Sequence, residues 1–306
     1  MDYAKKFRLE PNSKVKLDQI DAGYKGEHED KDSARLELEK YVQRLHDLQY
    51  LMYAENKRSF LIILQGMDAA GKDGTISHVL AAMNPQGCRV YGFKTPSGEE
   101  LAHDYLWRFH QVTPRKGYVT VFNRSHYEDV LVARVHNLVP VEVWSKRYEE
   151  INDFERQLSN NGTHIVKFYL HIDEKEQLDR FKQRLDDPSR QWKISESDYT
   201  EREYWHDYQL AYEDALSKCS TEYAPWYIIP ANHKWFRNLA VSEILVVTLE
   251  SLDMKFPAPT VNIRQIRERY HAALRKEGAS SRAEGLGLGA HSDSQFINPT
   301  GKQAKT

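Results

Sequence analysis

The chain carries the stretch Gly66-Met67-Asp68-Ala69-Ala70-Gly71-Lys72-Asp73-Gly74-Thr75 one residue after an apolar run over residues 60–64, and an apolar helical pattern over 76–83 follows it. A buried strand, a loop bounded by glycine, a lysine and a helix in this order are typical of a phosphate-binding P-loop. Backbone N–H groups of such a loop and the positive end of its helix hold an oxyanion, and Lys72 adds a mobile positive charge. A chance glycine-rich turn is the alternative, which the flanking strand and helix disfavour.

Two carboxylates make this loop unusual. The residue after the lysine is usually Ser or Thr, whose hydroxyl binds Mg²⁺, but here it is Asp73. A second acid, Asp68, lies inside the loop. An acid in a phosphate cradle is unfavourable unless a cation sits there too. The loop therefore predicts a Mg²⁺ site, with Mn²⁺ able to substitute and Asp68 as the main protein ligand.

The composition excludes several classes of protein. Of the 306 residues 40% are hydrophobic and 29% charged, the mean hydropathy is −0.72, and the formal net charge of −2 argues against a nucleic-acid partner. There are two cysteines without a pairing motif, so we expect no disulfide scaffold and a cytoplasmic location. No apolar run approaches the ~18 residues of a membrane span, and the N-terminus lacks the apolar segment of a signal peptide. We therefore expect no membrane association.

Strand-like runs alternate with helical patterns through most of the chain. This alternation predicts an α/β fold in which right-handed crossovers build a parallel sheet covered on both faces. A P-loop after the first strand is typical of a P-loop kinase-like, doubly wound sheet of about five parallel strands with a helical lid. The expected strands are 59–65, 90–93, 118–122, 164–170 and 226–229. The expected helices are 36–55, 73–83, 99–111, 126–135, 141–160, 173–185, 200–218 and 234–252.

We expect three parts along the chain. Residues 1–34 are polar and weakly patterned, which predicts an extended N-terminal arm. Residues 35–256 form the P-loop phosphotransferase domain, including a lid at about 185–208. Residues 257–306 form a polar C-terminal tail, which we expect to be disordered apart from a basic helix over 263–276.

A polar segment, Asn123-Arg124-Ser125-His126-Tyr127-Glu128, follows the third expected strand. The carboxyl ends of strands line the ligand crevice in doubly wound sheets, so this segment should face the P-loop. P-loop kinases usually place an aspartate here to hold Mg²⁺ through water, and Asn123 offers only a neutral oxygen, which makes it a weaker metal ligand. Arg124 is placed to bind the transferring phosphoryl group with two hydrogen bonds. An ordinary surface turn with a salt bridge is the alternative.

The stretch between the fourth and fifth expected strands carries several cations. Arg180 and Arg184 are four residues apart on one helix face, and a break that contains Lys193 follows. P-loop kinases have a lid at this point in the chain, whose closure brings cations over the phosphates and excludes water. Because acids outnumber bases here, a solvated helical hairpin is the alternative.

Lys94 follows the second expected strand and so points at the crevice, while Arg108 lies on the expected helix 99–111; each fits the site and the protein surface equally well. The histidines show no spacing of metal ligands, so we expect no zinc site.

Four motifs in order resemble the polyphosphate kinase 2 family, and the resemblance extends over about residues 35–256. They are the loop 66–75, Asn84-Pro85-Gln86-Gly87, Phe122 to Glu128, and Trp192-Lys193. The resemblance implies a Mg²⁺-dependent enzyme that reversibly transfers the terminal phosphate of inorganic polyphosphate to a nucleotide. Most of the family has Asp where this chain has Asn123 and Asn where it has Glu128. This pairing is similar to the subgroup, often called class III, that accepts AMP and ADP and makes ADP and ATP.

The resemblance also suggests a homodimer or homotetramer, with GMP and GDP as further candidate acceptors. The residues expected to be catalytic are Asp68, Lys72, Asn123, Arg124, Glu128 and Arg184. The residues expected to bind nucleotide or polyphosphate are Gly66, Ala69, Ala70, Gly71, Lys72, Asp73, Gly74, Thr75, Lys94, Arg108, Arg124, Arg180, Arg184 and Lys193.

Two rival functions remain. An ATP-dependent nucleoside monophosphate kinase needs the same loop and lid, but Asp73 in place of Ser or Thr disfavours it. A non-catalytic protein that binds nucleotide or polyphosphate is the second rival, and the presence of both Lys72 and Arg124 disfavours it.

Overall fold

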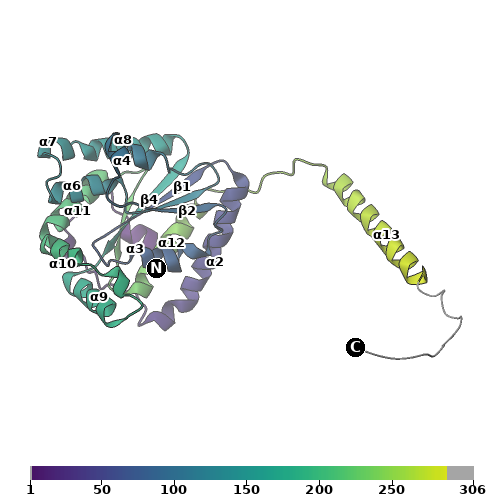
Figure 1. Ribbon diagram of the computed structural model, residues 1–306, viewed down its shortest axis with the longest axis horizontal. Helices are drawn as coiled ribbons and strands as arrows, with labels where there is room; N and C mark the ends of the chain where they lie inside the picture. The colour runs from purple at the N-terminus through teal and green to yellow at the C-terminus, as the bar shows by residue number, and fades with distance from the viewer. Residues whose placement is uncertain (1, 288–306) are drawn as a thin grey trace, which may run out of the picture. The chain divides into compact units, whose positions relative to one another are not determined.

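The computed structural model describes residues 2–287, with side-chain surroundings over 2–277. Its body, which ends at Phe256, is built on a five-stranded parallel sheet with the order β2-β3-β1-β4-β5 (Figure 1). All seven residues of the central strand are buried, as a parallel strand covered on both faces requires. The expected α/β class and parallel sheet are confirmed. The strands are β1 (Ser59–Gln65), β2 (Cys88–Gly92), β3 (Val119–Asn123), β4 (Thr163–His171) and β5 (Trp226–Pro230).

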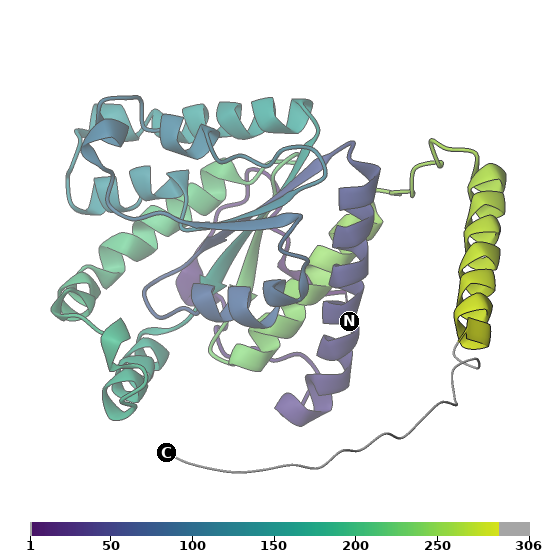
Figure 2. The ribbon, with the colours of Figure 1, turned by 45° about the vertical axis from the view of Figure 1, so that its right-hand side comes forward.

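Helices cover both faces of the sheet. On one face α2 (Lys31–Glu55) runs beside α12 (Lys234–Glu250), as Figures 1 and 2 show. Because α12 lies between α2 and β5 and also contacts α3 (Lys72–His78), it is buried almost all round. On the other face α8 (Arg147–Asn160) packs against β4 and against α11 (Trp205–Cys219).

The strand register sets where the functional segments leave the sheet. Leu64 of β1 pairs with Asn123 of β3, and the backbone N–H of Arg124 donates to the carbonyl of Leu64 at 3.1 Å. The P-loop and the polar segment after β3 therefore start side by side. The chain adds β2 and β3 on one side of β1, and β4 and β5 on the other. The carboxyl end of β1 is thus the switch point at which doubly wound sheets bind ligands.

The N-terminal segment is not an extended arm. It begins with α1 (Tyr3–Phe7), and both end residues of this helix are buried against the core. The backbone N–H of Leu9 donates to the carbonyl of Trp226, and Arg8 forms an antiparallel bridge to Tyr227. This segment therefore covers the outer edge of β5, which would otherwise expose unpaired backbone groups. The apolar residues of this polar segment are scattered without regular spacing, so the sequence pattern did not predict this packing.

Four long helices expected from periodicity are broken in the structure. The expected helix at 73–83 ends early and continues as a 3-10 turn, and those at 99–111 and 126–135 are likewise interrupted. The 141–160 pattern forms two helices. The short elements involved are η2 (Leu80–Ala82), α4 (Gly98–Leu101), α5 (Trp107–His110), η3 (His126–Asp129), α6 (Val132–Val135) and α7 (Val141–Trp144).

The expected lid region consists of short elements between two long helices. It contains the end of α9 (Glu174–Asp186), a 3-10 turn, η4 (Gln191–Lys193), and α10 (Glu196–Glu203), which leads into α11. Their side chains are mostly exposed.

The residues after Phe256 form a separate unit. Within the tail that we expected to be disordered, α13 spans Ile263–Gly287, so the basic helix expected over 263–276 is present and longer than predicted. Residues 288–306 of the expected tail lie outside the described residues. Among residues 2–287, none of the helices combines the length and the hydropathy needed to cross a lipid bilayer.

Candidate active site

The P-loop lysine folds back over its own loop. The ammonium of Lys72 donates to the carbonyl of Gly66 at 2.6 Å and to that of Met67 at 3.3 Å. Burial, together with the nearby charge of Arg124, lowers the pKa of Lys72 to about 8. A phosphate that enters the loop offers this ammonium a charged partner in place of two neutral carbonyls, which is a stronger hydrogen bond.

Arg124 forms ion pairs with Asp68 and Glu128, two of the residues expected to be catalytic. Its guanidinium lies 2.7 Å from Asp68 Oδ1 and 3.3 Å from Glu128 Oε2. Glu128 and Asp68 raise the pKa of Arg124 against the effect of burial, so this side chain stays charged. Its backbone has φ = 63°, in the left-handed region that non-glycine residues rarely occupy. Non-glycine residues in this region often lie at functional sites, where the surrounding structure holds them.

Asp73, at the position where P-loops usually have a hydroxyl, forms a contact between three elements. Its carboxylate accepts a hydrogen bond from the side-chain amide of Asn123 at 2.8 Å. The ammonium of Lys193, in the lid, lies 3.7 Å from the other carboxylate oxygen. Asp73 therefore connects the P-loop helix to both the β3 end and the lid.

Arg184 lies at the base of the lid. Its guanidinium is 3.7 Å from Asp198 Oδ2 and donates to the carbonyl of Lys193 at 3.4 Å. These contacts stay within the lid, so Arg184 makes no direct contact with the P-loop among those that the structure records for the described residues. Its catalytic role stays a prediction.

Two of the expected phosphate-binding arginines support the backbone instead. Arg180 is buried and donates to the carbonyls of Ala69 at 2.8 Å and Ala70 at 2.9 Å, from beneath the loop. Arg108 is also buried and donates to the carbonyl of Lys94 at 2.9 Å. Every nitrogen of the Arg180 guanidinium has an acceptor within the protein, so Arg180 offers no free donor to a phosphate and its predicted direct contact with polyphosphate is not supported. Arg108 lines the cavity described below, but in a fixed orientation.

The remaining predicted residues of the loop have structural roles that fit a phosphate cradle. Gly71 has φ = 106°, and a Cβ there would lie 1.8 Å from a nitrogen of Arg237. The hydroxyl of Thr75 donates to the carbonyl of Gly71 at 3.2 Å. The other predicted residues, Gly66, Ala69, Ala70 and Gly74, supply the loop backbone and the first helical turn.

Arg237 was missed by sequence reasoning. It is buried at the start of α12, and its side chain donates to Asn238 Oδ1. Burial and the charge of Arg180 lower its pKa to about 9. Among the described residues no carboxylate forms an ion pair with it. Its position in the first turn of the helix that follows the fifth strand, near the edge of the sheet that lines the crevice, was the signal that could have found it.

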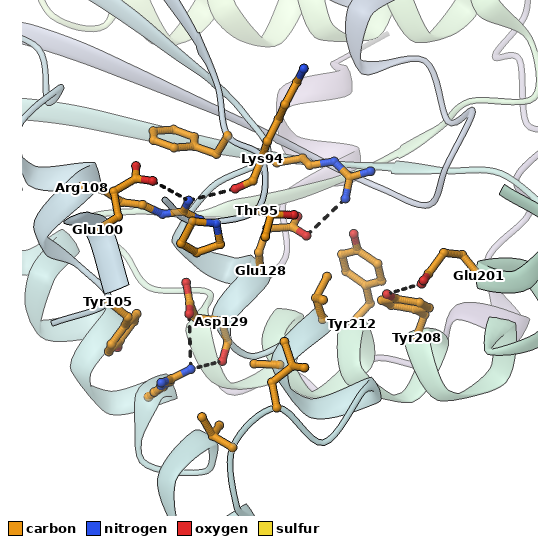
Figure 3. A pocket seen from close by; sticks show the side chains of 18 of the residues that line it. Lys94, Thr95, Glu100, Tyr105, Arg108, Glu128, Asp129, Glu201, Tyr208 and Tyr212 are labelled. Carbon is orange, nitrogen blue, oxygen red and sulfur yellow. Dashed lines mark hydrogen bonds and ion pairs between the residues drawn. The ribbon is translucent and has the colours of Figure 1, made fainter. Parts of the chain in front are cut away.

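A cavity of about 1530 Å³ opens beside the P-loop. One end is charged and contains Asp68, Arg124 and Glu128, while exposed Lys94 lies at its rim. Another part of the lining is apolar. Figure 3 shows Arg108 and Lys94 on one side of the cavity and Glu201, Tyr208 and Tyr212 on the other. The apolar lining comes from Leu101, Leu106, Val132, Ala133, Leu138, Val139 and Val143.

A second ion pair lies in this cavity away from the P-loop, and sequence reasoning missed it. Arg147 donates to the carbonyl of Asp129 at 2.9 Å and to its carboxylate at 3.3 Å. Burial raises the pKa of Asp129 to about 6, although Arg147 opposes this shift. Tyr105 lies next to this pair, and its ring is 4.5 Å from the Arg147 guanidinium. Hydrogen-bonding groups beside an apolar surface suit the recognition of a planar ring with polar edges.

The donor set fits a magnesium ion that is held mainly by its substrates. Among the described residues, no group of three acidic, histidine or cysteine side chains is close enough to hold a metal alone. Mg²⁺ commonly takes one or two protein carboxylates, with phosphate and water oxygens completing the shell. Asp68 is a partly exposed carboxylate at the cavity, and the amide of Asn123 leaves its oxygen available while its nitrogen binds Asp73.

Comparison with known proteins is consistent with this geometry. Residues 28–257 match the family model described as polyphosphate kinase 2. The AMP/ADP-polyphosphate phosphotransferase of Meiothermus ruber is 52% identical over 256 residues, which is 83% of this chain and 96% of that protein. The ADP-polyphosphate phosphotransferase of Rhodopseudomonas palustris is 46% identical over 84% of this chain and 93% of that protein. A crystal structure of polyphosphate kinase 2 from Arthrobacter aurescens TC1 superposes with a TM-score of 0.86 at 41% identity, covering 89% of this chain and 97% of that one.

Proposed function

This chain belongs to the polyphosphate kinase 2 family, and we propose that it transfers the terminal phosphate of inorganic polyphosphate to AMP and ADP, reversibly and with Mg²⁺. The observation that carries the proposal is Arg124, held between Asp68 and Glu128 where the P-loop meets the cavity. A fixed cation at this junction can bind the phosphoryl group as it passes from a donor on the loop to an acceptor in the cavity.

The donor phosphates would bind to the loop backbone and to Lys72. Arg124 would contact the oxygens of the transferring group, where charge accumulates in the transition state. Asp68, with Asn123 contributing weakly, would hold Mg²⁺, which neutralises phosphate charge when it is bound. Closure of the lid would bring Lys193 over the phosphates, because this side chain already reaches the P-loop helix at Asp73.

A chain of phosphates needs cations beyond the P-loop, and the structure has them around the start of α12. Burial lowers the pKa of Lys234, and the nearby charges of Arg180, Arg190 and Arg237 lower it further. Lys234 and Arg190 are exposed, so they are available to a long anion. This local concentration of charge lets a protein of net charge −2 bind a polyanion.

The cavity is the place for the acceptor nucleotide. The part with Asp68, Arg124 and Glu128 would take the acceptor phosphates, and the apolar lining together with Asp129 and Arg147 would take the base. A volume of about 1530 Å³ leaves room for either a monophosphate or a diphosphate. Asp129 and Arg147 offer both an acceptor and donors, so GMP and GDP are acceptors to test beside AMP and ADP.

The decisive experiment incubates AMP, ADP, GMP and GDP separately with polyphosphate, Mg²⁺ and the purified chain, and separates the products by ion-exchange chromatography. We expect ADP and ATP from AMP, and ATP from ADP, with no other phosphoryl donor. Absence of ATP from ADP with folded protein would refute the proposal. A reaction with ADP but not with AMP would refute the acceptor range. Product formation by Lys72→Ala protein equal to that of wild type would indicate a contaminating kinase.

We also propose a cytoplasmic homo-oligomer. Cys88 and Cys219 are both unpaired, as in proteins of reducing compartments. Light scattering coupled to size-exclusion chromatography tests the assembly, and a monomer at micromolar concentration would contradict it.

A further inference from the structure

A fully buried cluster of polar side chains lies behind the segment that carries Arg124. It consists of Lys167 on β4, Glu155 on α8, and His126 and Tyr127 in η3, and none of the four has exposed surface. We refer to these four residues as the buried cluster. The chemistry proposed above uses none of them, although two of them lie between Arg124 and Glu128 in the sequence.

The ammonium of Lys167 is completely satisfied inside the protein. It donates to Glu155 Oε2, to the hydroxyl of Tyr127 at 2.8 Å and to the carbonyl of Cys219 at 2.7 Å. An ammonium has three N–H donors, so none remains for a ligand. Lys167 therefore acts through its partners rather than on a substrate.

The carboxylate of Glu155 is hydrogen-bonded to both turn residues, His126 and Tyr127. Its Oε1 accepts from the hydroxyl of Tyr127 at 2.9 Å and lies 3.2 Å from Nε2 of His126. Burial alone would raise the pKa of Glu155, but the charges and hydrogen bonds of Lys167 and His126 together outweigh it, so the pKa is lowered. Burial also lowers the pKa of His126, so its ring is neutral. An ionised Glu155 only accepts, so the proton of His126 is on Nε2.

Such a cluster is a poor way to gain stability. A buried ion pair replaced by apolar residues of similar volume often leaves a protein equally or more stable, because burying charges is costly. Its value must therefore lie in the geometry that it imposes. Two consecutive residues of the turn are tied to one carboxylate on another helix, and Ser125 is held from the other side by the amide of Gln65 at 3.2 Å.

The turn needs this restraint, because Arg124 has a left-handed backbone. A strained residue keeps its conformation only where its surroundings determine it. We propose that Glu155 and Lys167 are positioning residues that fix the η3 turn and thereby aim Arg124 and Glu128 at the transferring phosphoryl group. This inference rests on the proposed function, because the phosphoryl group is supplied by that reaction.

The test compares kcat and both KM values of wild type with those of Glu155→Gln and Tyr127→Phe. Glu155→Gln keeps the shape of the side chain and removes its charge, and Tyr127→Phe deletes a single hydroxyl. We expect kcat to fall about 10- to 100-fold in the first and a few-fold in the second, because small displacements of a catalytic group cost this much. The KM for polyphosphate should not change, because the loop and the lid are untouched.

A double-mutant cycle separates positioning from general damage. If Glu155 acts through Arg124, the effect of Glu155→Gln on kcat should shrink in an Arg124→Lys background. The matched control is Glu243→Gln, since Glu243 is equally a buried acid, but its partners are the N–H of Tyr3 and the hydroxyl of Tyr41. It should lower the melting temperature without changing kcat.

The outcomes are distinct. Wild-type kcat in both Glu155→Gln and Tyr127→Phe would overturn the inference, as would an equal loss of kcat in Glu243→Gln or full additivity with Arg124→Lys. If Glu155→Gln does not fold, Tyr127→Phe alone decides. An inactive wild-type protein would refute the proposed function, whereas an active wild type with unaffected variants would refute only the positioning role.

Discussion

Arg124 combines a functional side chain with an unfavourable backbone, so two substitutions at this position should separate activity from stability. Both Arg124→Gly and Arg124→Ala remove the guanidinium and leave Asp68 and Glu128 without their shared partner. Only glycine adopts φ = 63° at little cost. The two variants should therefore be equally inactive but unequally stable.

The expected difference follows from two opposing contributions. A left-handed conformation costs a residue with a side chain about 1–2 kcal/mol, which glycine avoids. Glycine also loses more conformational freedom on folding, which costs about 0.4–1 kcal/mol relative to alanine. Arg124→Gly should therefore be more stable than Arg124→Ala by roughly 0.5–1 kcal/mol, or about 2 °C in melting temperature for a domain of this size. Loss of a cation that contacts the transferring phosphoryl group should lower kcat at least about 10³-fold in both.

Circular dichroism melts of the two variants and wild type give the stability, and ATP formation from ADP and polyphosphate gives the activity. Retention of more than about a tenth of wild-type kcat by either variant would contradict the role of Arg124 in charge stabilisation. Equal or reversed stabilities would contradict the argument about its backbone.

Three further predictions concern the loop. Because the pKa of Lys72 is lowered to about 8, kcat/KM for polyphosphate should fall as pH rises through this value and the ammonium loses its proton. If kcat/KM of Lys72→Arg falls at the same pH, the decrease belongs to another group. Asp68→Asn should raise the Mg²⁺ concentration for half-maximal activity about tenfold or more. The control variant Asp104→Asn, at the cavity rim, should leave this concentration unchanged. Equal Mg²⁺ titration curves for wild type and Asp68→Asn would exclude Asp68 as a metal ligand. Gly71→Ala should destabilise the protein by about 2 kcal/mol or more, measured by urea unfolding, because its Cβ meets Arg237 and its φ is 106°; an unchanged unfolding midpoint would contradict this steric argument.

Sequence reasoning located the centre of the site because that centre depends on strand ends. The P-loop follows β1 and the segment with Arg124 follows β3, and parallel neighbours end at the same edge of the sheet. The contacts of Arg124 with Asp68 and Glu128 could be expected once the two strands were recognised as neighbours. The catalytic roles themselves stay predictions until the variants are assayed.

The cations outside this centre could not be assigned in the same way. Arg180 and Arg184 share one helix, yet Arg180 is bound to the carbonyls beneath the P-loop and Arg184 contacts the lid. The interaction of Arg180 with Ala69 joins residues 111 positions apart. Periodicity along a helix says which residues share a face, but it does not say which distant backbone that face meets.

Local hydrophobic patterns and loop chemistry were enough to predict the P-loop, the five strands and the two acids of the loop. Packing between distant segments settles which arginines support the loop backbone and which line the cavity, how the N-terminal segment covers β5, and that a buried cluster lies behind Arg124. A long side chain takes its role from the groups that it reaches. Those groups are brought to it by packing between segments far apart in the chain.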